Sequence, residues 1–269
     1  MMQAIVPPRT GPARARRFGS LRTIAALMLR EMATSYGRSP GGYLWAVLEP
    51  VAGIALLSAV FSMGFRAPSL GVNFPLFYAT GMLPFMMFSH LAAKIAQSID
   101  FSRPLMAYPA VTWLDAVLAR FLLNLVTQLM VGQLILAGIL VLFRTRAILD
   151  FGDILAAYGL AALLGLGVGT LNCLLTGLFP LWVHAWSILM RPMFLISTIF
   201  FTFESVPQPW RDMLWYNPLV HVIGLMRRGF YGGYDAAFAS PAYVAGLAMA
   251  LLAAGMFFLR RFHRVILNR

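Results

Sequence analysis

The sequence is poor in charged residues. Only 11% of its 269 residues are charged and 60% are hydrophobic, whereas a soluble domain carries about 25% charged residues. The mean hydropathy is +0.78. These values argue against a soluble globular domain and indicate a chain that lies mostly in lipid.

Cysteine and lysine occur once each. Cys173 has no partner for an intrachain disulfide, and we interpret it as a packed thiol. Lys94 stands in Ala93-Lys94-Ile95, whereas a Walker A loop ends in Gly-Lys-Ser/Thr. ATP hydrolysis by these 269 residues is therefore excluded, and we expect ATP and Mg²⁺ only on a partner.

Clusters of metal-binding or catalytic side chains are also missing. The histidines are scattered and form no HExxH motif and no Cys/His cluster, so we predict no catalytic residue and no metal site. Each histidine is interpreted as a polar residue near a membrane interface: His90, His184, His221 and His263. The nine carboxylates lie mostly at loop edges, which argues against a buried proton relay. A transporter built this way needs energy from a partner.

Long uncharged runs are what the sequence has instead. They cover 67–93, 121–143, 154–190 and 236–259, and a bilayer core takes roughly 20 apolar helical residues to cross. We read the crossings as helices because backbone polar groups must be satisfied within the segment in lipid. The fold class is an all-α polytopic membrane protein. Six transmembrane helices are predicted at about 46–66, 74–94, 120–143, 154–178, 182–203 and 240–260.

Arginine and lysine predict the orientation. With both termini inside, the inner segments hold fifteen of these residues and the outer segments hold six. The positive-inside rule therefore predicts cytoplasmic termini. The net charge of +12 is then mostly a matter of topology. Nucleic acid is not expected as a partner, because it requires a basic face on a soluble domain.

Outside the crossings, the chain divides into tails, an amphipathic segment and loops. We expect a basic cytoplasmic tail at 1–19 without a signal peptide, an amphipathic interface helix at 20–38, the transmembrane domain at 44–261 and a cytoplasmic tail at 262–269. In the interface helix, apolar residues recur at helical spacing while the charged Arg22, Arg30 and Glu31 lie elsewhere. The apolar residues are Leu21, Ile24, Met28 and Met32.

Two connections are unusual. The inner loop from Ala96 to Ala119 is polar enough to be exposed to solvent. The outer segment from Glu204 to Ser240 is too apolar for a solvated loop and breaks at Asn217-Pro218. We predict a re-entrant outer helical hairpin around that break, whose non-helical backbone must be covered by protein or water.

Several stretches resemble a known family, the type-2 ABC exporter permeases. The first runs from Leu29-Arg30-Glu31 through Tyr36-Gly37-Arg38-Ser39 and into Gly42-Tyr43-Leu44-Trp45-Ala46-Val47-Leu48-Glu49-Pro50. Within that family the closest likeness is to capsular polysaccharide export permeases of the KpsM, BexB and CtrC kind. The stretch from Tyr108 to Arg120 supports the narrower match, as do Asn217-Pro218-Leu219-Val220-His221, Arg227, Gly229, Phe230, Gly233 and Tyr234. Arg228 departs from the pattern, because we expect an acidic residue there.

The resemblance implies an assembly in the bacterial inner membrane. It would contain two copies of this permease and two copies of a cytoplasmic ABC ATPase. A periplasm-spanning polysaccharide co-polymerase and an outer-membrane channel would complete it. The resemblance further implies that the interface helix and a cytoplasmic coupling helix in the loop 96–113 contact the ATPase. We assign coupling to Asp100, Phe101, Ser102, Arg103, Pro104, Leu105, Arg30 and Tyr36. The alternative is an ordinary loop whose basic residues set topology.

Arg191 and Glu49 are the charged candidates for a substrate path. Arg191 stands roughly 14 Å into the fifth predicted crossing at 1.5 Å per residue, where a lipid-facing arginine costs at least about 2.5–3.5 kcal/mol. It lines the path of an acidic polymer, or pairs with Glu49, or snorkels to the inner interface. Glu49, before Pro50, stands at the inner mouth of the first crossing, where a structural role is the alternative.

Aromatic residues gather near the predicted interfaces. An anchoring belt is the usual explanation, and a sugar-stacking lining is the alternative. They are Tyr36, Tyr43, Trp45, Trp210, Trp215, Tyr216, Phe230, Tyr231 and Tyr234. We assign Tyr43 and Trp45 to the path. The outer gate is assigned to Glu204, Trp210, Trp215, Asn217, Pro218, His221 and Arg227.

Closely spaced glycines mark the fourth crossing. Gly165, Gly167 and Gly169 permit close helix approach, either within the bundle or at a dimer seam.

The function predicted from these features is that of the permease subunit of an ATP-driven exporter. Its substrate would be a lipid-linked acidic capsular polysaccharide, moved between two permeases. The nearest alternatives are export of O-antigen, teichoic acid or a small drug. A membrane-embedded enzyme or a scaffold is the alternative from another class.

Overall fold

A computed structural model describes residues 19–35, 41–106, 108, 111–143, 145 and 149–267. Across these ranges the regular structure is helical and contains no strand. Five helices of this part of the chain are long and apolar enough to cross a membrane. They are α2 (Gly42–Gly64), α3 (Phe74–Ala96), α5 (Trp113–Leu142), α6 (Phe151–Leu178) and α10 (Pro241–Leu267).

The remaining helices are shorter. Before and between the long helices lie α1 (Gly19–Ser35) and α4 (Ser98–Ser102), and α7 (Trp182–Ile196) follows α6. The connection from α7 to α10 contains the 3₁₀ helix η1 (Phe203–Ser205), α8 (Trp210–Trp215) and α9 (Pro218–Phe230).

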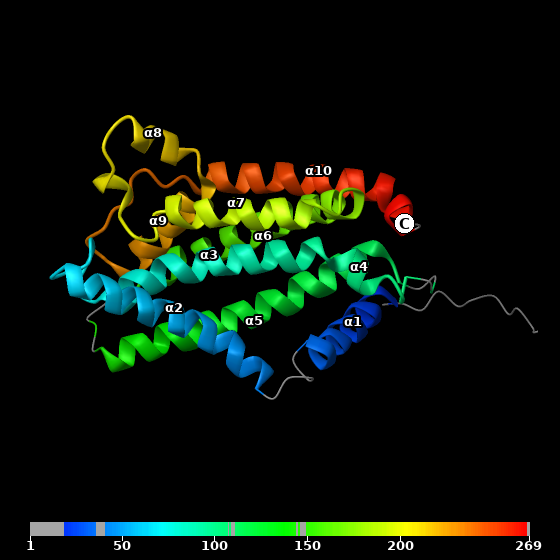
Figure 1. Ribbon diagram of the computed structural model, residues 1–269, viewed down its shortest axis with the longest axis horizontal. Helices are drawn as coiled ribbons and strands as arrows, with labels where there is room; N and C mark the ends of the chain where they lie inside the picture. The colour runs from blue at the N-terminus through cyan, green and yellow to red at the C-terminus, as the bar shows by residue number, and fades with distance from the viewer. Residues whose placement is uncertain are drawn as a thin grey trace, which may run out of the picture.

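The long helices run side by side along the longest axis of the molecule (Figure 1). α1, α4 and the C-terminal end of α10 lie at one end of the bundle, which we call the α1 end. α8 and α9 lie at the opposite end, which we call the α9 end. The described residues of the two segments predicted as non-spanning, 20–35 and 204–240, thus lie at opposite ends.

Glycines let α6 pack closely against its neighbours at the centre of the bundle. A Cβ atom on Gly165 or Gly169 would meet the α3 residues Leu91 or Ile95 within 2.9 Å. One on Gly167 would lie 2.5 Å from the carbonyl oxygen of Ala248 in α10. Of the two roles considered for these glycines, the structure shows packing within the bundle.

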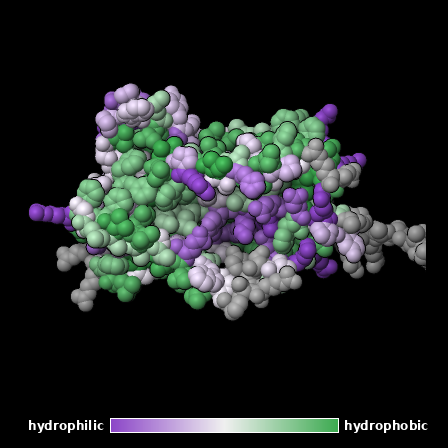
Figure 2. Space-filling model, in the orientation of Figure 1, coloured by the Kyte–Doolittle hydropathy of each residue, from purple (hydrophilic) through white to green (hydrophobic). Residues whose placement is uncertain are grey.

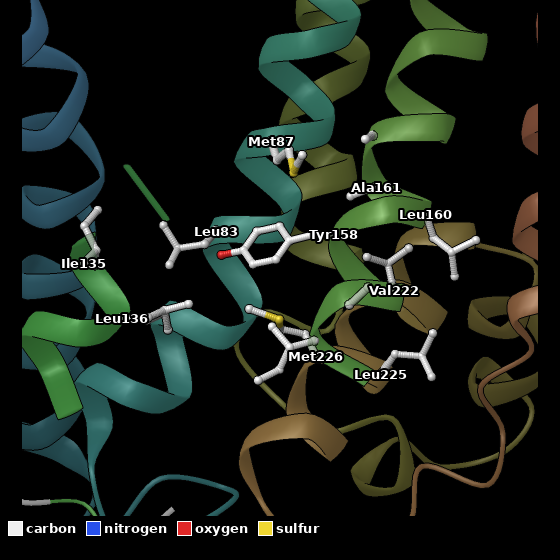
Figure 3. Packing of buried hydrophobic residues seen from close by; sticks show 14 of the residues in the cluster. Leu83, Met87, Ile135, Leu136, Tyr158, Leu160, Ala161, Val222, Leu225 and Met226 are labelled. Atoms are coloured by element: carbon white, nitrogen blue, oxygen red, sulfur yellow. The ribbon is translucent and has the colours of Figure 1, made fainter. Parts of the chain in front are cut away.

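The largest hydrophobic cluster joins α3, α5, α6 and α9 (Figure 3). Leu83 and Met87 of α3 face Leu136 of α5 and Tyr158 of α6. Val222 and Met226 of α9 belong to the same cluster. α9 is therefore part of the hydrophobic core at the α9 end rather than a separate loop.

Side-chain caps explain where two long helices begin. Thr112 and Asp115 form a reciprocal capping box at the start of α5. The carboxylate of Asp150 accepts hydrogen bonds from the backbone N–H groups of Gly152 and Asp153 at the start of α6. These caps place the first turns at Trp113 and Phe151, upstream of the crossings predicted at 120–143 and 154–178.

The segment predicted as the fifth crossing differs from the others. α7 ends at Ile196 after 15 residues, and residues 197–202 are not helical. Thr198 has a φ of 60°, which lies outside the right-handed helical region, so the regular helix does not continue through it. A β-branched residue adopts this conformation only where its surroundings impose it. α7 alone is shorter than the roughly 20 residues that a crossing takes, so the count of six stays a prediction.

Candidate functional site

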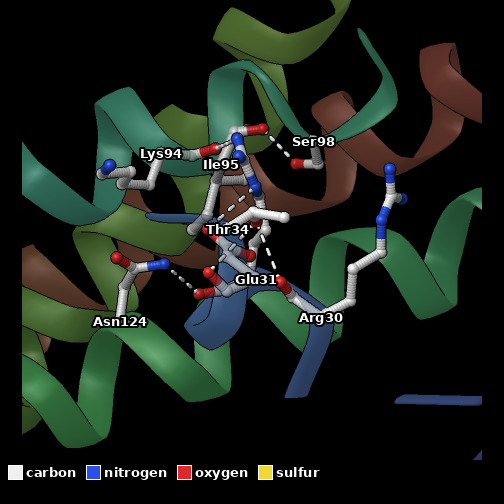
Figure 4. A network of polar contacts seen from close by, with 8 residues as sticks. Arg30, Glu31, Thr34, Lys94, Ile95, Ser98 and Asn124 are labelled. Carbon is white, nitrogen blue, oxygen red and sulfur yellow. Dashed lines mark hydrogen bonds and ion pairs between the residues drawn. The ribbon is translucent and has the colours of Figure 1, made fainter. Parts of the chain in front are cut away.

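Arg120 is the centre of a buried polar cluster at the α1 end, to which Glu31 and Lys94 in Figure 4 belong. Arg120 is 4% exposed, and its Nε lies 3.2 Å from Oε1 of Glu31. Its Nη1 donates to the carbonyl oxygen of Lys94 at 2.8 Å. Its guanidinium also lies 4.2 Å from the ring centroid of Phe101. One side chain therefore joins α1, α3, α4 and α5.

The packed face of α1 differs from the face that the hydrophobic pattern predicts. Ile24 and Leu27 pack against α5, whereas Leu21 and Met32 are 61% and 38% exposed. Glu31, predicted to lie away from the packed face, is buried. In this orientation Glu31 meets Arg120, so the carboxylate that α1 buries is paired with a cation.

A second contact fastens the start of α1 to the start of α5. The Ser20 hydroxyl donates to Oδ1 of Asp115, the carboxylate that also caps α5. Asp115 is 3% exposed. α1 is therefore held against α5 at both ends.

The residues assigned to motor coupling divide between surface and core. Asp100, Arg103 and Pro104 are exposed, Phe101 and Leu105 are half-buried, and Ser102 is buried. Arg103 donates to the carbonyl oxygen of Ile266 at 2.6 Å, which ties the loop to the end of α10. Arg30 lies 5.4 Å from the Phe101 ring. Tyr36 lies outside the described residues.

Arg227 is the centre of a second buried cluster, at the α9 end. It is 1% exposed and donates to the carbonyl oxygens of Phe201 at 2.8 Å and Ile199 at 3.1 Å. Its guanidinium stacks over Phe77 at 4.1 Å. Burial lowers the pKa of Arg227 to about 10, so it remains charged at neutral pH. A cation of α9 thus holds the non-helical backbone after α7.

Asn217 fastens the same junction. Its Oδ1 accepts from the N–H of Leu219 and caps α9, where Pro218 follows as the first helical residue. Its Nδ2 donates to the carbonyl oxygen of Ile196 at 3.3 Å and to the Ser197 hydroxyl at 3.2 Å. Asn217 is buried, so its side chain serves both the Asn-Pro break and the end of α7.

His221 uses both ring nitrogens within the protein. Its Nε2 lies 2.7 Å from the carbonyl oxygen of Trp215, and its Nδ1 accepts from the N–H of Ser240 at 3.2 Å. A ring that donates at one nitrogen and accepts at the other is neutral. Burial lowers the pKa of His221. This histidine connects α8, α9 and the segment before α10.

Other residues assigned to the outer gate lie nearer the surface. Trp210 is 63% exposed, whereas Trp215 is half-buried and its ring lies 5.1 Å from that of His221. Glu204 is exposed and accepts from the Tyr234 hydroxyl at 3.0 Å. Burial raises the pKa of Tyr234, so the hydroxyl keeps its proton.

The departure from the family pattern at Arg228 has a partner. Its Nε and Nη2 donate to the two carboxylate oxygens of Asp153 at 2.5 and 2.6 Å, and this pairing raises the pKa of Arg228. Asp150, Asp153, Arg228 and Asp235 line a cavity of about 720 Å³ at the α9 end. The charge of α9 at this position is thus balanced by α6.

Polar groups also occur between the two ends of the bundle. Figure 2 shows hydrophilic residues gathered on one face over the half of the bundle nearer the α1 end, beside hydrophobic surfaces. On α3 and α5, Nδ1 of His90 and Nε2 of Gln128 lie 2.5 Å apart. Glu49 and Lys94 interact electrostatically with this histidine. The sequence pattern predicts only an interface position for His90 and carries no signal that marks Gln128.

The residues assigned to a path lie mainly on exposed surfaces. Glu49 and Arg191 are exposed and form no ion pair within the part of the chain that the structure describes. Trp45 is 62% exposed. The side chain of Tyr43 lies outside the described residues.

Known proteins match almost the whole chain. The sequence model of the family described as ABC-2 type transporter matches residues 22–231. The polysialic acid transport protein KpsM of Escherichia coli is 32% identical over 87% of this chain and 91% of its own. The capsule polysaccharide export inner-membrane protein CtrC of Neisseria meningitidis serogroup A is 27% identical over 90% and 92%. The corresponding protein BexB of Haemophilus influenzae is 26% identical over 91% and 92%.

Proposed function

The chain belongs to the ABC-2 type transporter family, and on this basis we propose that it is the permease subunit of a capsular polysaccharide exporter. The substrate is a lipid-linked acidic polysaccharide that crosses the inner membrane. The observation that carries the proposal is the likeness to three named capsule or polysialic acid transport proteins over 87–91% of this chain. Polysialic acid, the substrate named for one of them, carries a carboxylate on every sugar.

Energy comes from a separate subunit. Two copies of the permease assemble with two copies of a cytoplasmic ABC ATPase, which binds ATP and Mg²⁺. A periplasm-spanning co-polymerase and an outer-membrane channel receive the polymer. The absence of a Walker A motif from the 269 residues supports this division of labour.

The permease crosses the membrane six times with both termini in the cytoplasm. The fifth crossing is α7 together with residues 197–203. Arg227 donates to the carbonyl oxygens of Ile199 and Phe201, and Asn217 donates to that of Ile196 at the end of α7. Such bonding is what non-helical backbone requires at membrane depth. α1 lies in the inner interface, and α8 with α9 forms the re-entrant outer gate.

The movement of the ATPase on closure is transmitted to the helix bundle through α1 and α4. Support comes from Arg120, whose contacts join both helices to α3 and α5. Replacing the exposed Asp100 and Pro104 by alanine is expected to weaken the ATPase contact about tenfold, a loss of about 1.4 kcal/mol. Co-purification with the ATPase and rates of hydrolysis measure it. Gln208→Ala, exposed in the connection before α8, is the matched control, and an unchanged double variant would count against coupling through α4.

Arg191 attracts the acidic polymer on a path between two permeases. It is exposed on α7 in the single chain, and a charged residue at this depth is favourable only where water or a polar ligand reaches it. Arg191→Met is expected to lower export at normal abundance of the protein. Arg260→Met removes an equally exposed cation at the α1 end and serves as the control.

Analysis of cell extracts tests the function as a whole. Cells that lack the permease are expected to accumulate finished polysaccharide inside, because synthesis continues without export. Cells that lack a synthetic enzyme contain no finished polymer. Absence of polymer from permease-deficient cells would therefore contradict the proposed function.

A further inference from the structure

A hydrogen-bonded pair of neutral side chains lies inside the bundle. Gln128 of α5 and His90 of α3 are both half-buried, and Nε2 of the amide lies 2.5 Å from Nδ1 of the ring. An amide –NH₂ only donates, so Nδ1 accepts and the ring proton is on Nε2. The pair has a defined tautomer and no net charge.

One donor and one acceptor of this pair remain unused. The Nε2–H of His90 and Oε1 of Gln128 have no hydrogen-bond partner among the described residues. Neither belongs to the fully buried unpartnered atoms of those residues. One free donor and one free acceptor on two hydrogen-bonded side chains are complementary to hydroxyl groups, each of which donates and accepts.

The surroundings favour a polar ligand over lipid. His90 is six residues from the end of α3 at Ala96, roughly 9 Å at 1.5 Å per residue, and the hydrophilic face in Figure 2 covers this half of the bundle. Polar groups left unpaired against hydrocarbon cost roughly 2–7 kcal/mol, so they face water or a ligand. The nearby charges, Glu49 and Lys94, are opposite in sign.

We propose that His90 and Gln128 form a hydroxyl-binding pair that holds successive sugars of the polysaccharide through neutral hydrogen bonds. The inference rests on the proposed function and adds a mode of recognition to it. Arg191 attracts the negative charge of the polymer, whereas this pair binds groups that every sugar carries. Neutral hydrogen bonds of modest strength suit a polymer that must advance one sugar after another.

Two near-isosteric variants separate ligand binding from helix packing. His90→Asn places an amide oxygen where Nδ1 stands, so the bond to Gln128 persists while the outward donor is lost. His90→Gln places an amide nitrogen near the position of Nε2 and restores that donor. Gln133→Leu, on an exposed position of the same helix as Gln128, is the matched control.

The experiment measures binding of a fluorescent sialic acid oligomer to the purified permease and ATPase complex. The same oligomer with its carboxylates reduced to alcohols retains its hydroxyls and is the second probe. We expect His90→Asn to weaken binding of both probes by about tenfold, the effect of one or two neutral hydrogen bonds, at an unchanged unfolding temperature. His90→Gln keeps the outward donor but loses the acceptor for Gln128 and is expected to bind both probes more tightly than His90→Asn. Gln133→Leu is expected to bind both probes like the wild type.

Three results would overturn the inference. Wild-type affinity in His90→Asn would make the pair a structural contact between α3 and α5. A loss of affinity confined to the acidic probe would mean that His90 recognises the charge of the polymer rather than its hydroxyl groups. Binding of neither probe by the wild-type complex would overturn the proposed function itself, and the hydroxyl-binding pair with it.

Discussion

Arg120 and Glu31 form an ion pair that water barely reaches, since they are 4% and 3% exposed. Removing one partner of such a pair leaves a buried charge without compensation. We expect Arg120→Met to lower the free energy of unfolding by about 3–5 kcal/mol. The apparent unfolding temperature of the purified protein measures it.

The matched variants test whether the pair is the cause. Replacing both Glu31 and Arg120 by methionine is expected to recover much of the loss, because apolar residues of similar volume replace buried pairs at little cost. Arg22→Met, at an exposed position of α1, should have no effect. A double variant as unstable as the single one would show that the charge pair is not what stabilises this end.

His221 predicts a pH dependence of stability. Its folded-state pKa is lowered by burial, so on acidification the unfolded chain takes up a proton first, near the ordinary pKa of about 6.5. The stabilisation is complete above that pH and is lost as the pH falls through the folded-state pKa.

Unfolding temperatures between pH 8 and pH 5 check this dependence. His221→Asn is expected to reduce the acid-induced decrease. His184→Asn, at an exposed position, should retain it. An equal decrease in wild type and His221→Asn would assign the pH dependence to other groups.

At the scale of elements, the packing of α6 against α10 depends on Gly167. A Cβ there would lie 2.5 Å from a backbone oxygen, so Gly167→Ala is expected to separate the helices and lower the unfolding temperature. Gly159, on the same helix, has no neighbouring atom within 4 Å of the place that a methyl group would occupy. Gly159→Ala is therefore expected to stabilise the helix by about 0.5–1 kcal/mol. The same sign of change in both variants would contradict this account.

The sequence pattern predicts that helix α7 exists but does not predict where it ends. The uncharged stretches on both sides of Arg191 predict a helix there, and a helix forms at Trp182–Ile196. Its end is decided by Asn217 and Arg227, which bond the carbonyl groups of residues 196, 199 and 201. These partners come from a later element, so the hydropathy of 182–203 holds no signal of the break.

At the scale of the whole molecule, the prediction concerns which end of the bundle faces the cytoplasm. Cys173 is buried at 2% exposure, and Cys173→Ser provides a background without cysteine. We expect Gly233→Cys to react with an impermeant maleimide added to intact spheroplasts. Asp100→Cys should react only after the membrane is permeabilised, because the positive-inside rule puts α4 in the cytoplasm. The reverse pattern would invert the orientation.

The sequence by itself determined the class of molecule and its family. Long uncharged runs, sparse charge and the N-terminal and Asn-Pro motifs indicate a helical membrane permease, because hydropathy and motif are properties of contiguous residues. Amphipathic spacing and the apolar character of residues 204–240 also predict two non-spanning segments, and their placement relative to the membrane stays a prediction.

Only the tertiary structure decided which polar residues meet. Gln128 contacts His90 at a separation of 38 residues, and Arg227 reaches carbonyl groups 26 and 28 residues away. Glu31 turns toward Arg120 against the prediction from its own helix. Such pairs are selected by the cost of leaving charges and hydrogen-bonding groups unpaired in a medium without water, and that cost depends on neighbours that packing alone supplies.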